Sequence, residues 1–109
     1  MTIPKGWENE GVKFDADKPR CDLLDAYALE ELSKVLTFGA EKYAPDNWRK
    51  GIRMSRLLAA ALRHTFALMR GEDVDGETGL SHAAHAMCCM MFIIWTLKNK
   101  PEMDDRYVL

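Results

Sequence analysis

Three histidines are the residues of this 109-residue chain best suited to metal chemistry. His82 and His85 are three positions apart, so they share a face if their segment is helical. His64 lies six residues before Arg70, roughly 9 Å along a helix that rises 1.5 Å per residue. If the two helices form an antiparallel hairpin, the three imidazoles lie at the same level.

The segment between these histidines, residues 71–80, is rich in carboxylates and glycine. Its acids are Glu72, Asp73, Asp75 and Glu77. Imidazole nitrogens favour Mn, Fe, Co or Zn, and carboxylates also admit Mg. We therefore predict a divalent-metal site made by His64, His82, His85 and a loop acid such as Asp75. The alternative is that the histidines are ordinary packed or surface side chains and the acids a solvated cluster beside a helix N-terminus.

Asn47 and Trp48 form a second group with chemical potential. An indole face stacks on a nucleobase, and an asparagine amide forms a bidentate pair with adenine. The pair therefore predicts a site that reads a purine. The alternative is a tryptophan folded onto the core, with the asparagine in its turn.

Isolated charges along the chain are candidates for phosphate contacts and catalysis. Lys13, Lys18, Arg20 and Arg63 are the basic candidates, with exposed, solvated charge as the alternative role. Glu41 stands near the end of a predicted helix, where a carboxylate opposes the helix dipole. We therefore expect Glu41 to serve a site.

The elements that position these residues are predicted to be helices. Apolar residues recur at three and four positions over 23–42, 56–70 and 82–97, and no segment alternates with period two. The chain is predicted to be one all-α domain over 1–109, with an irregular arm over 1–22, a helical core over 23–98 and an exposed tail over 99–109.

Caps and apolar faces refine this prediction. Ser55 and Ser81 are predicted N-caps of the second and third helices. The apolar residues that repeat at helical spacing in the second helix are Leu58, Ala61, Leu62 and Met69. From Ala86 to Trp95 the third helix is apolar on nearly every side, which predicts that neighbours wrap it, including another copy of the chain. The bundle is thus expected to be completed in a homodimer or homotetramer.

Composition excludes several classes of protein. With 15 basic and 17 acidic residues, the chain lacks the positive charge needed for general nucleic-acid binding. The longest apolar run, 86–95, is shorter than the ~18 residues of a membrane span, and three cysteines without a pairing pattern suit a reducing cytoplasm. We expect a cytoplasmic protein without membrane contacts. Phosphate loops, serine elbows and dinucleotide fingerprints are absent from the sequence.

Five runs resemble one family. They are KFDADKPR at 13–20, LTFGAEKY at 36–43, NWRKG at 47–51, RH at 63–64 and GEDVDGETGLSHAAH at 71–85. Over about residues 12–97 the chain resembles the phage dATP/dGTP diphosphohydrolases of the MazZ type, relatives of the MazG-like all-α nucleotide pyrophosphohydrolases. The wider superfamily carries E-x-x-E on one helix and E-x-x-D on the next. Here His82 and His85 stand where the second pair would be.

The resemblance implies a small all-α bundle that cleaves a purine deoxynucleoside triphosphate to the monophosphate and pyrophosphate. It implies a divalent metal, Mg, Mn or Co, with Fe or Zn as alternatives, and the host cytoplasm if the chain is phage-encoded. In metal-assisted hydrolysis of this kind, we expect Glu72, Glu77 or Glu41 to orient the attacking water, and Arg63 with Lys13 or Lys18 to stabilise the departing pyrophosphate. Two alternatives are a non-catalytic nucleotide-binding protein and a helical adaptor that uses the apolar third helix.

Overall fold

The structure is a computed structural model that describes residues 5–6 and 8–107. Its elements, in chain order, are η1 (Cys21–Leu23), α1 (Ala26–Lys42), η2 (Asn47–Lys50), α2 (Met54–Met69), α3 (His82–Asn99) and η3 (Pro101–Met103). The only β pairing among the described residues is one isolated bridge between Val74 and Ser81. The predicted all-α class and its three helices are confirmed.

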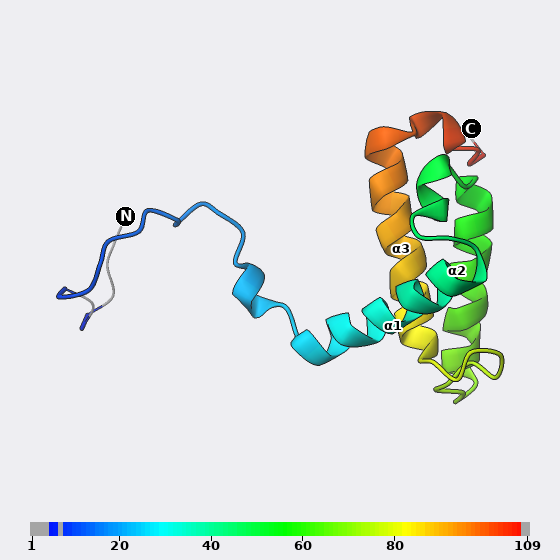
Figure 1. The fold of residues 1–109 in the computed structure, drawn as a ribbon, viewed down its shortest axis with the longest axis horizontal. Coiled ribbons are helices and arrows are strands. Elements are labelled where there is room, and N and C mark those ends of the chain that lie inside the picture. Colours follow the sequence, from blue (N-terminus) through cyan, green and yellow to red (C-terminus); the bar gives the residue numbers. More distant parts are fainter. Residues whose placement is uncertain (1–4, 7, 108–109) are drawn as a thin grey trace.

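Helices α2 and α3 form the predicted antiparallel hairpin, joined by the acidic loop (Figure 1). The buried residues of α2 are Met54, Leu57, Ala61 and Ala67. Leu62 and Met69, which have the predicted helical spacing, are 51% and 78% exposed. Together with Phe66 they form a second apolar stripe, spaced i, i+4 and i+7, on the outside of α2. Periodicity cannot decide between two apolar faces of one helix.

Helix α1 packs across α3. Leu32 and Val35 from α1 and Ala84 and Cys88 from α3 form the buried cluster at this crossing. Helix α1 begins three residues later than predicted, because the Asp25 carboxylate accepts the Ala28 N–H at 2.8 Å and caps the helix there. Burial raises the Cys88 pKa to about 12, so this thiol packs as a small hydrophobic group.

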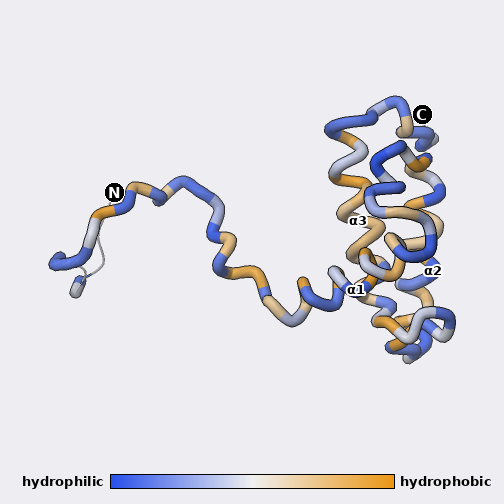
Figure 2. The backbone as a smooth tube through the Cα atoms, viewed as in Figure 1, coloured by the Kyte–Doolittle hydropathy of each residue, from blue (hydrophilic) through white to orange (hydrophobic). Residues whose placement is uncertain are grey.

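The N-terminal segment runs away from the bundle and, up to Arg20, forms no helix or strand in its described residues (Figure 1). Its described residues up to Arg20 are all exposed. The radius of gyration is 18.6 Å, well above the ~13 Å of a compact domain of this length. Figure 2 shows apolar positions along this projecting segment. The remaining residues of the predicted arm, 1–4 and 7, and the last two of the predicted tail, 108–109, lie outside the described part.

The segment after α3 returns to the start of α2. The Asp105 carboxylate accepts the Ser55 backbone N–H at 2.8 Å and the Ser55 hydroxyl at 2.6 Å. The prediction of Ser55 as N-cap was therefore wrong, because α2 begins at Met54. The Ser55 N–H, which has no partner within the helix, is bound by a carboxylate fifty residues away. Gly51, at φ 107°, lies under the same segment, and a Cβ there would lie 3.2 Å from side-chain atoms of Lys100 and Met103.

None of the helices in the described part of the chain is both long enough and apolar enough to cross a membrane.

Candidate metal centre

The acidic loop is folded back onto the two helices by its own backbone. The Asp75 N–H donates to the Leu80 carbonyl at 2.8 Å, and the His82 N–H donates to the Asp73 carbonyl at 3.0 Å. The Ser81 hydroxyl accepts the Ala84 N–H at 3.2 Å, which confirms the predicted cap of α3. The loop thus brings its acids to the helix end that carries the histidines.

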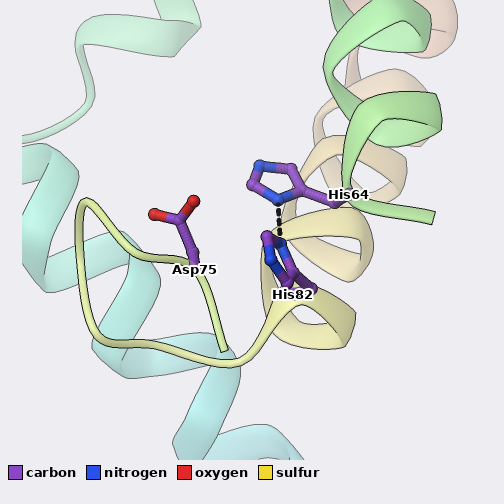
Figure 3. Close-up of side chains that lie close together, drawn as sticks. All are labelled: His64, Asp75 and His82. Atoms are coloured by element: carbon purple, nitrogen blue, oxygen red, sulfur yellow. Dashed lines mark hydrogen bonds between the residues drawn. The ribbon is translucent and has the colours of Figure 1, made fainter. Parts of the chain in front are cut away.

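The three histidines converge from both helices. The Nδ1 atoms of His64 and His82 face each other at 2.8 Å (Figure 3). The rings of His64 and His85 stack, with centroids 4.5 Å apart and an interplanar angle of 7°. Burial, and then the neighbouring His85 and His82, lower the His64 pKa below its ordinary value of 6.5. Burial lowers the His85 pKa as well, so these imidazoles favour the neutral form that binds metals.

Asp75 completes the cluster from the loop. One donor atom each from His64, Asp75 and His82 lie within 4.8 Å of one another, and Figure 3 shows the carboxylate beside the two imidazoles. Burial raises the Asp75 pKa, but hydrogen bonds from Thr78 and the nearby His85 and His64 outweigh it and lower the pKa overall. Asp75 is therefore an ionised acceptor next to the rings of His64 and His82.

The chemistry of this donor set fits a divalent ion. The two Nδ1 atoms, 2.8 Å apart, are within hydrogen-bond distance. When both rings are neutral, one Nδ1 donates its hydrogen and the lone pair of the other accepts it. Nitrogens that bind one ion at ~2.0–2.1 Å lie roughly 3 Å apart, close to this separation. Two imidazoles and one carboxylate suit Mn, Fe, Co or Zn better than Mg, which prefers oxygen ligands.

His85 takes a different position from the other two histidines. Its Nε2 lies 2.8 Å from the Thr78 hydroxyl and 3.9 Å from the Asp75 carboxylate. No nitrogen of His85 belongs to the three-residue donor cluster. The structure therefore brings His85 to the site through Thr78. Sequence reasoning missed this residue, although the run at 71–85 contains it, because the sequence does not show which way its hydroxyl points.

The cluster opens into a cleft of about 970 Å³ lined by α1, α2, α3, η2 and the acidic loop. Its basic residues are Lys42, Arg49, Arg63 and Arg70. Three of them are paired with acids: Lys42 with Glu77 at 3.3 Å, Arg49 with Asp46 at 2.9 Å and Arg70 with Glu72 at 3.7 Å. Among the described residues Arg63 has no such ion pair, so it can bind an anion without first losing an ion pair.

The three glutamates predicted as catalytic are separated by the structure. Glu72 and Glu77 line the cleft, and the Glu72 carboxylate lies 3.9 Å from Nε2 of His82. Glu41 is exposed on α1 and is absent from the residues that line the cleft. The carboxylate of Glu72 is therefore placed next to the donor cluster, and that of Glu41 is not.

Trp48 lines the cleft but already has aromatic partners. Its ring stacks on Phe92 at 4.4 Å and 16°, and its ring centroid lies 5.1 Å from that of Trp95 in an edge-on arrangement. The Arg49 guanidinium lies 4.3 Å from the Trp48 ring centroid. Asn47, half-buried in the same turn, also lines the cleft. This packing agrees with the alternative of a tryptophan folded onto the core.

The basic arm residues are not at the cleft. Lys13 and Lys18 are exposed, and neither lines it. Arg20 instead donates two hydrogen bonds to the neighbouring Asp22 carboxylate, at 2.8 and 2.7 Å. Since the arm projects away from its own bundle, these charges do not complete the site of the same chain in this conformation (Figure 1).

Comparison with known proteins adds a family. A family model described as "dATP/dGTP diphosphohydrolase, N-terminal" matches residues 8–106. A curated protein of Salmonella phage PMBT28, named dATP/dGTP diphosphohydrolase, is 47% identical over 96 residues, which cover 88% of this chain and 33% of that protein. The chain thus spans about a third of the length of the curated relative it matches. No solved structure is significantly similar to it.

Proposed function

The chain belongs to the family of dATP/dGTP diphosphohydrolase N-terminal regions, and from that premise we propose that it is a metal-dependent purine nucleotide pyrophosphohydrolase. The reaction is hydrolysis of the α–β phosphoanhydride bond of dATP or dGTP. Water attacks, and the products are the deoxynucleoside monophosphate and pyrophosphate.

The observation that carries this proposal is the cluster of His64, Asp75 and His82 at the cleft. Its donor atoms lie within 4.8 Å of one another, at the end of the hairpin where the acidic loop closes. A site that hydrolyses a nucleoside triphosphate needs ligands for a divalent cation and a space for the base and sugar. The donor cluster supplies the first requirement and the cleft of about 970 Å³ the second.

We propose that His64, Asp75 and His82 hold the ion, with His85 beside them. When bound, a divalent ion neutralises phosphate charge and lowers the pKa of a water molecule. Arg63, which lines the cleft and has no ion pair among the described residues, binds the phosphate oxygens and stabilises the charge that develops on the pyrophosphate.

Glu72 is the carboxylate that we assign to orienting the attacking water. It lines the cleft, and its carboxylate lies 3.9 Å from His82 Nε2, the ring nitrogen that does not face His64. Glu77 is held by Lys42 at 3.3 Å, so its proposed role is to position that lysine at the cleft. For Glu41, outside the cleft, no role in the reaction is proposed.

Asn47 and Trp48 are proposed to contact the purine from η2. The Asn47 amide is the group suited to the base edge. One face of the Trp48 ring stacks on Phe92, so a base can contact only the ring edge or the face that the Arg49 guanidinium covers. Access to that face requires the Arg49 guanidinium to move.

We further propose that a second copy of the chain covers the apolar surface that the bundle leaves exposed. On α3 the exposed stripe is Met90, Ile94 and Leu97, spaced i, i+4 and i+7, and Ile94 is 72% exposed. On the projecting part of α1, Tyr27 is 71% exposed. An arm that leaves its own bundle carries Lys13 and Lys18 toward such a neighbour.

Light scattering tests this proposal. We expect a dimer or tetramer, and we expect Ile94→Asp to dissociate it. A monomer at every protein concentration contradicts the proposal.

The function is tested by chromatography of products after incubating the full chain with each common ribo- and deoxynucleoside triphosphate. Reactions contain Mg, Mn or Co, and a chelator control contains none. Monophosphate from dATP and dGTP alone, only with metal, supports the proposal. Nucleotide binding without turnover would instead indicate a nucleotide-binding protein, and neither binding nor turnover a helical adaptor.

A further inference from the structure

Thr78 is the polar side chain of the acidic loop that joins two predicted site residues. Its hydroxyl lies 2.9 Å from Asp75 Oδ2 and 2.8 Å from His85 Nε2. It also accepts the Leu80 N–H at 3.2 Å. Thr78 is half-buried and lines the cleft, so its hydroxyl is held between three partners at the edge of the site.

The hydrogens of this network can be assigned. A hydroxyl has one hydrogen and two acceptor lone pairs. The Asp75 carboxylate accepts only, so the Thr78 hydrogen goes to Asp75 Oδ2 and the lone pairs accept from Leu80 N–H and from His85. His85 Nε2 must then carry a hydrogen, which leaves Nδ1 of the neutral ring unprotonated.

The same network selects one oxygen of Asp75. Both the hydroxyl and the backbone N–H of Thr78 donate to Oδ2, at 2.9 and 3.0 Å. In the described part of the chain no hydrogen bond reaches Oδ1. The carboxylate is therefore pinned through one oxygen, and the other is left for a ligand.

From this geometry we infer that Thr78 is a positioning residue, which orients Asp75 for metal binding and fixes His85 in the Nε2–H tautomer. The inference rests on the proposed function, since it concerns the same donor cluster. Outer partners of this kind are worth ~10–100-fold in metal affinity, because they fix the direction of a ligand's lone pair.

The loop does not need this hydroxyl in order to close. The Gly79 N–H donates to the Asp75 carbonyl at 2.8 Å, the Asp75 N–H donates to Leu80, and the Thr78 N–H already reaches Asp75 Oδ2. These bonds survive removal of the hydroxyl. What is lost is the link between Asp75 and His85, together with the acceptor of the Leu80 N–H, whose 3.2 Å bond is the longest that the hydroxyl makes.

The first test is Mn²⁺ titration of the metal-free full chain by calorimetry, without nucleotide. Thr78→Val keeps the shape and removes the hydroxyl, and Thr78→Ser keeps the hydroxyl. We expect Thr78→Val to weaken Mn²⁺ binding by ~10–100-fold and Thr78→Ser to restore it to within about threefold of wild type. Thr65→Val is the matched control, because its hydroxyl bonds only the Ala61 carbonyl of its own helix, at 2.8 Å.

The second test is the tautomer of His85 in the wild-type protein, read by nitrogen NMR of the imidazole rings. We expect hydrogen on Nε2 in wild type and in Thr78→Ser. Hydrogen on Nδ1 in wild type overturns the inference even if Thr78→Val fails to fold, as does wild-type Mn²⁺ affinity in a folded Thr78→Val. Neither measurement uses nucleotide, so absence of dATP or dGTP turnover counts against the proposed function alone.

Discussion

The two ends of the α2–α3 hairpin are both held by polar contacts between distant segments, yet the contacts differ in kind. At the loop end, formed by residues 71–82 with His64, two imidazole nitrogens face each other at 2.8 Å and burial lowers the pKa of His64. At the tail end, formed by residues 51–55 and 99–107, the Asp105 carboxylate meets two Ser55 donors.

This difference separates a site from a structural joint. The tail end pairs each donor with an acceptor and satisfies a free N–H at a helix start, which stabilises the fold. At the loop end two imidazole nitrogens face each other beside an ionised carboxylate, a set of donor atoms that a cation can bind. Changes at the loop end should therefore affect binding, and changes at the tail end should affect stability.

Removing a donor at the loop end should have the largest effect. We expect His64→Ala or His82→Ala to reduce Mn²⁺ affinity by more than ~100-fold, because losing a ligand costs more than losing its outer partner. Turnover of dATP should fall with it. The measurement is calorimetry of the metal-free protein, with the exposed Glu30→Gln on α1 as control. Wild-type Mn²⁺ affinity in the histidine variants would contradict the assignment of metal binding to the loop end.

Trp48, on η2 between the two ends, should contribute mainly to stability. Trp48→Ala removes the stack on Phe92 and the contact with Trp95, and we expect a loss of about 3 kcal/mol in the free energy of unfolding, since the ring is only half-buried. Trp48→Phe should lose less. Urea denaturation measures both. Unchanged stability with weakened nucleotide binding would instead favour the purine-reading role.

The pH dependence of stability just below pH 6.5 should come from the loop end. His64 and His85 have folded pKa values below their ordinary 6.5, so the unfolded state binds more protons as pH falls below that value. Stability of the metal-free protein should thus rise with pH through this window, up to about 6.5. Asp75 adds stability that is present above its ordinary 3.8 and lost as pH falls through its lowered pKa.

Urea midpoints measured across this range test the assignment. A His64→Gln, His85→Gln double variant should flatten the rise below about pH 6.5, whereas Asp105→Asn should leave that slope unchanged. An equal slope in the double variant would place the titrating groups elsewhere.

The smallest effect is expected at the tail end. Asp105→Asn weakens the hydrogen bonds that hold the Ser55 N–H and hydroxyl and that lower the Asp105 pKa. The melting temperature should fall on the order of a few degrees, with Mn²⁺ affinity unchanged. Calorimetric melting and Mn²⁺ titration of the same samples decide it. A loss of Mn²⁺ affinity would show that the two ends are coupled through the helices.

The sequence by itself determined the three helices, the cap at Ser81 and the hairpin that unites the three histidines. These follow from local rules, since helical spacing and a capping serine depend on neighbouring residues. Convergence of His64 with His82 followed from an antiparallel hairpin and the rise of a helix, which are also readable along the chain.

Only the tertiary structure decided which apolar stripe of α2 is buried, that Asp105 binds the start of that helix, and that His85 reaches Asp75 through Thr78. Each depends on a contact whose partner is not fixed by spacing in the sequence: a choice between two apolar faces, a carboxylate fifty residues away, and a hydroxyl turned inward by a folded loop. The side chains specify what can bond, and the packed helices decide which of those bonds form.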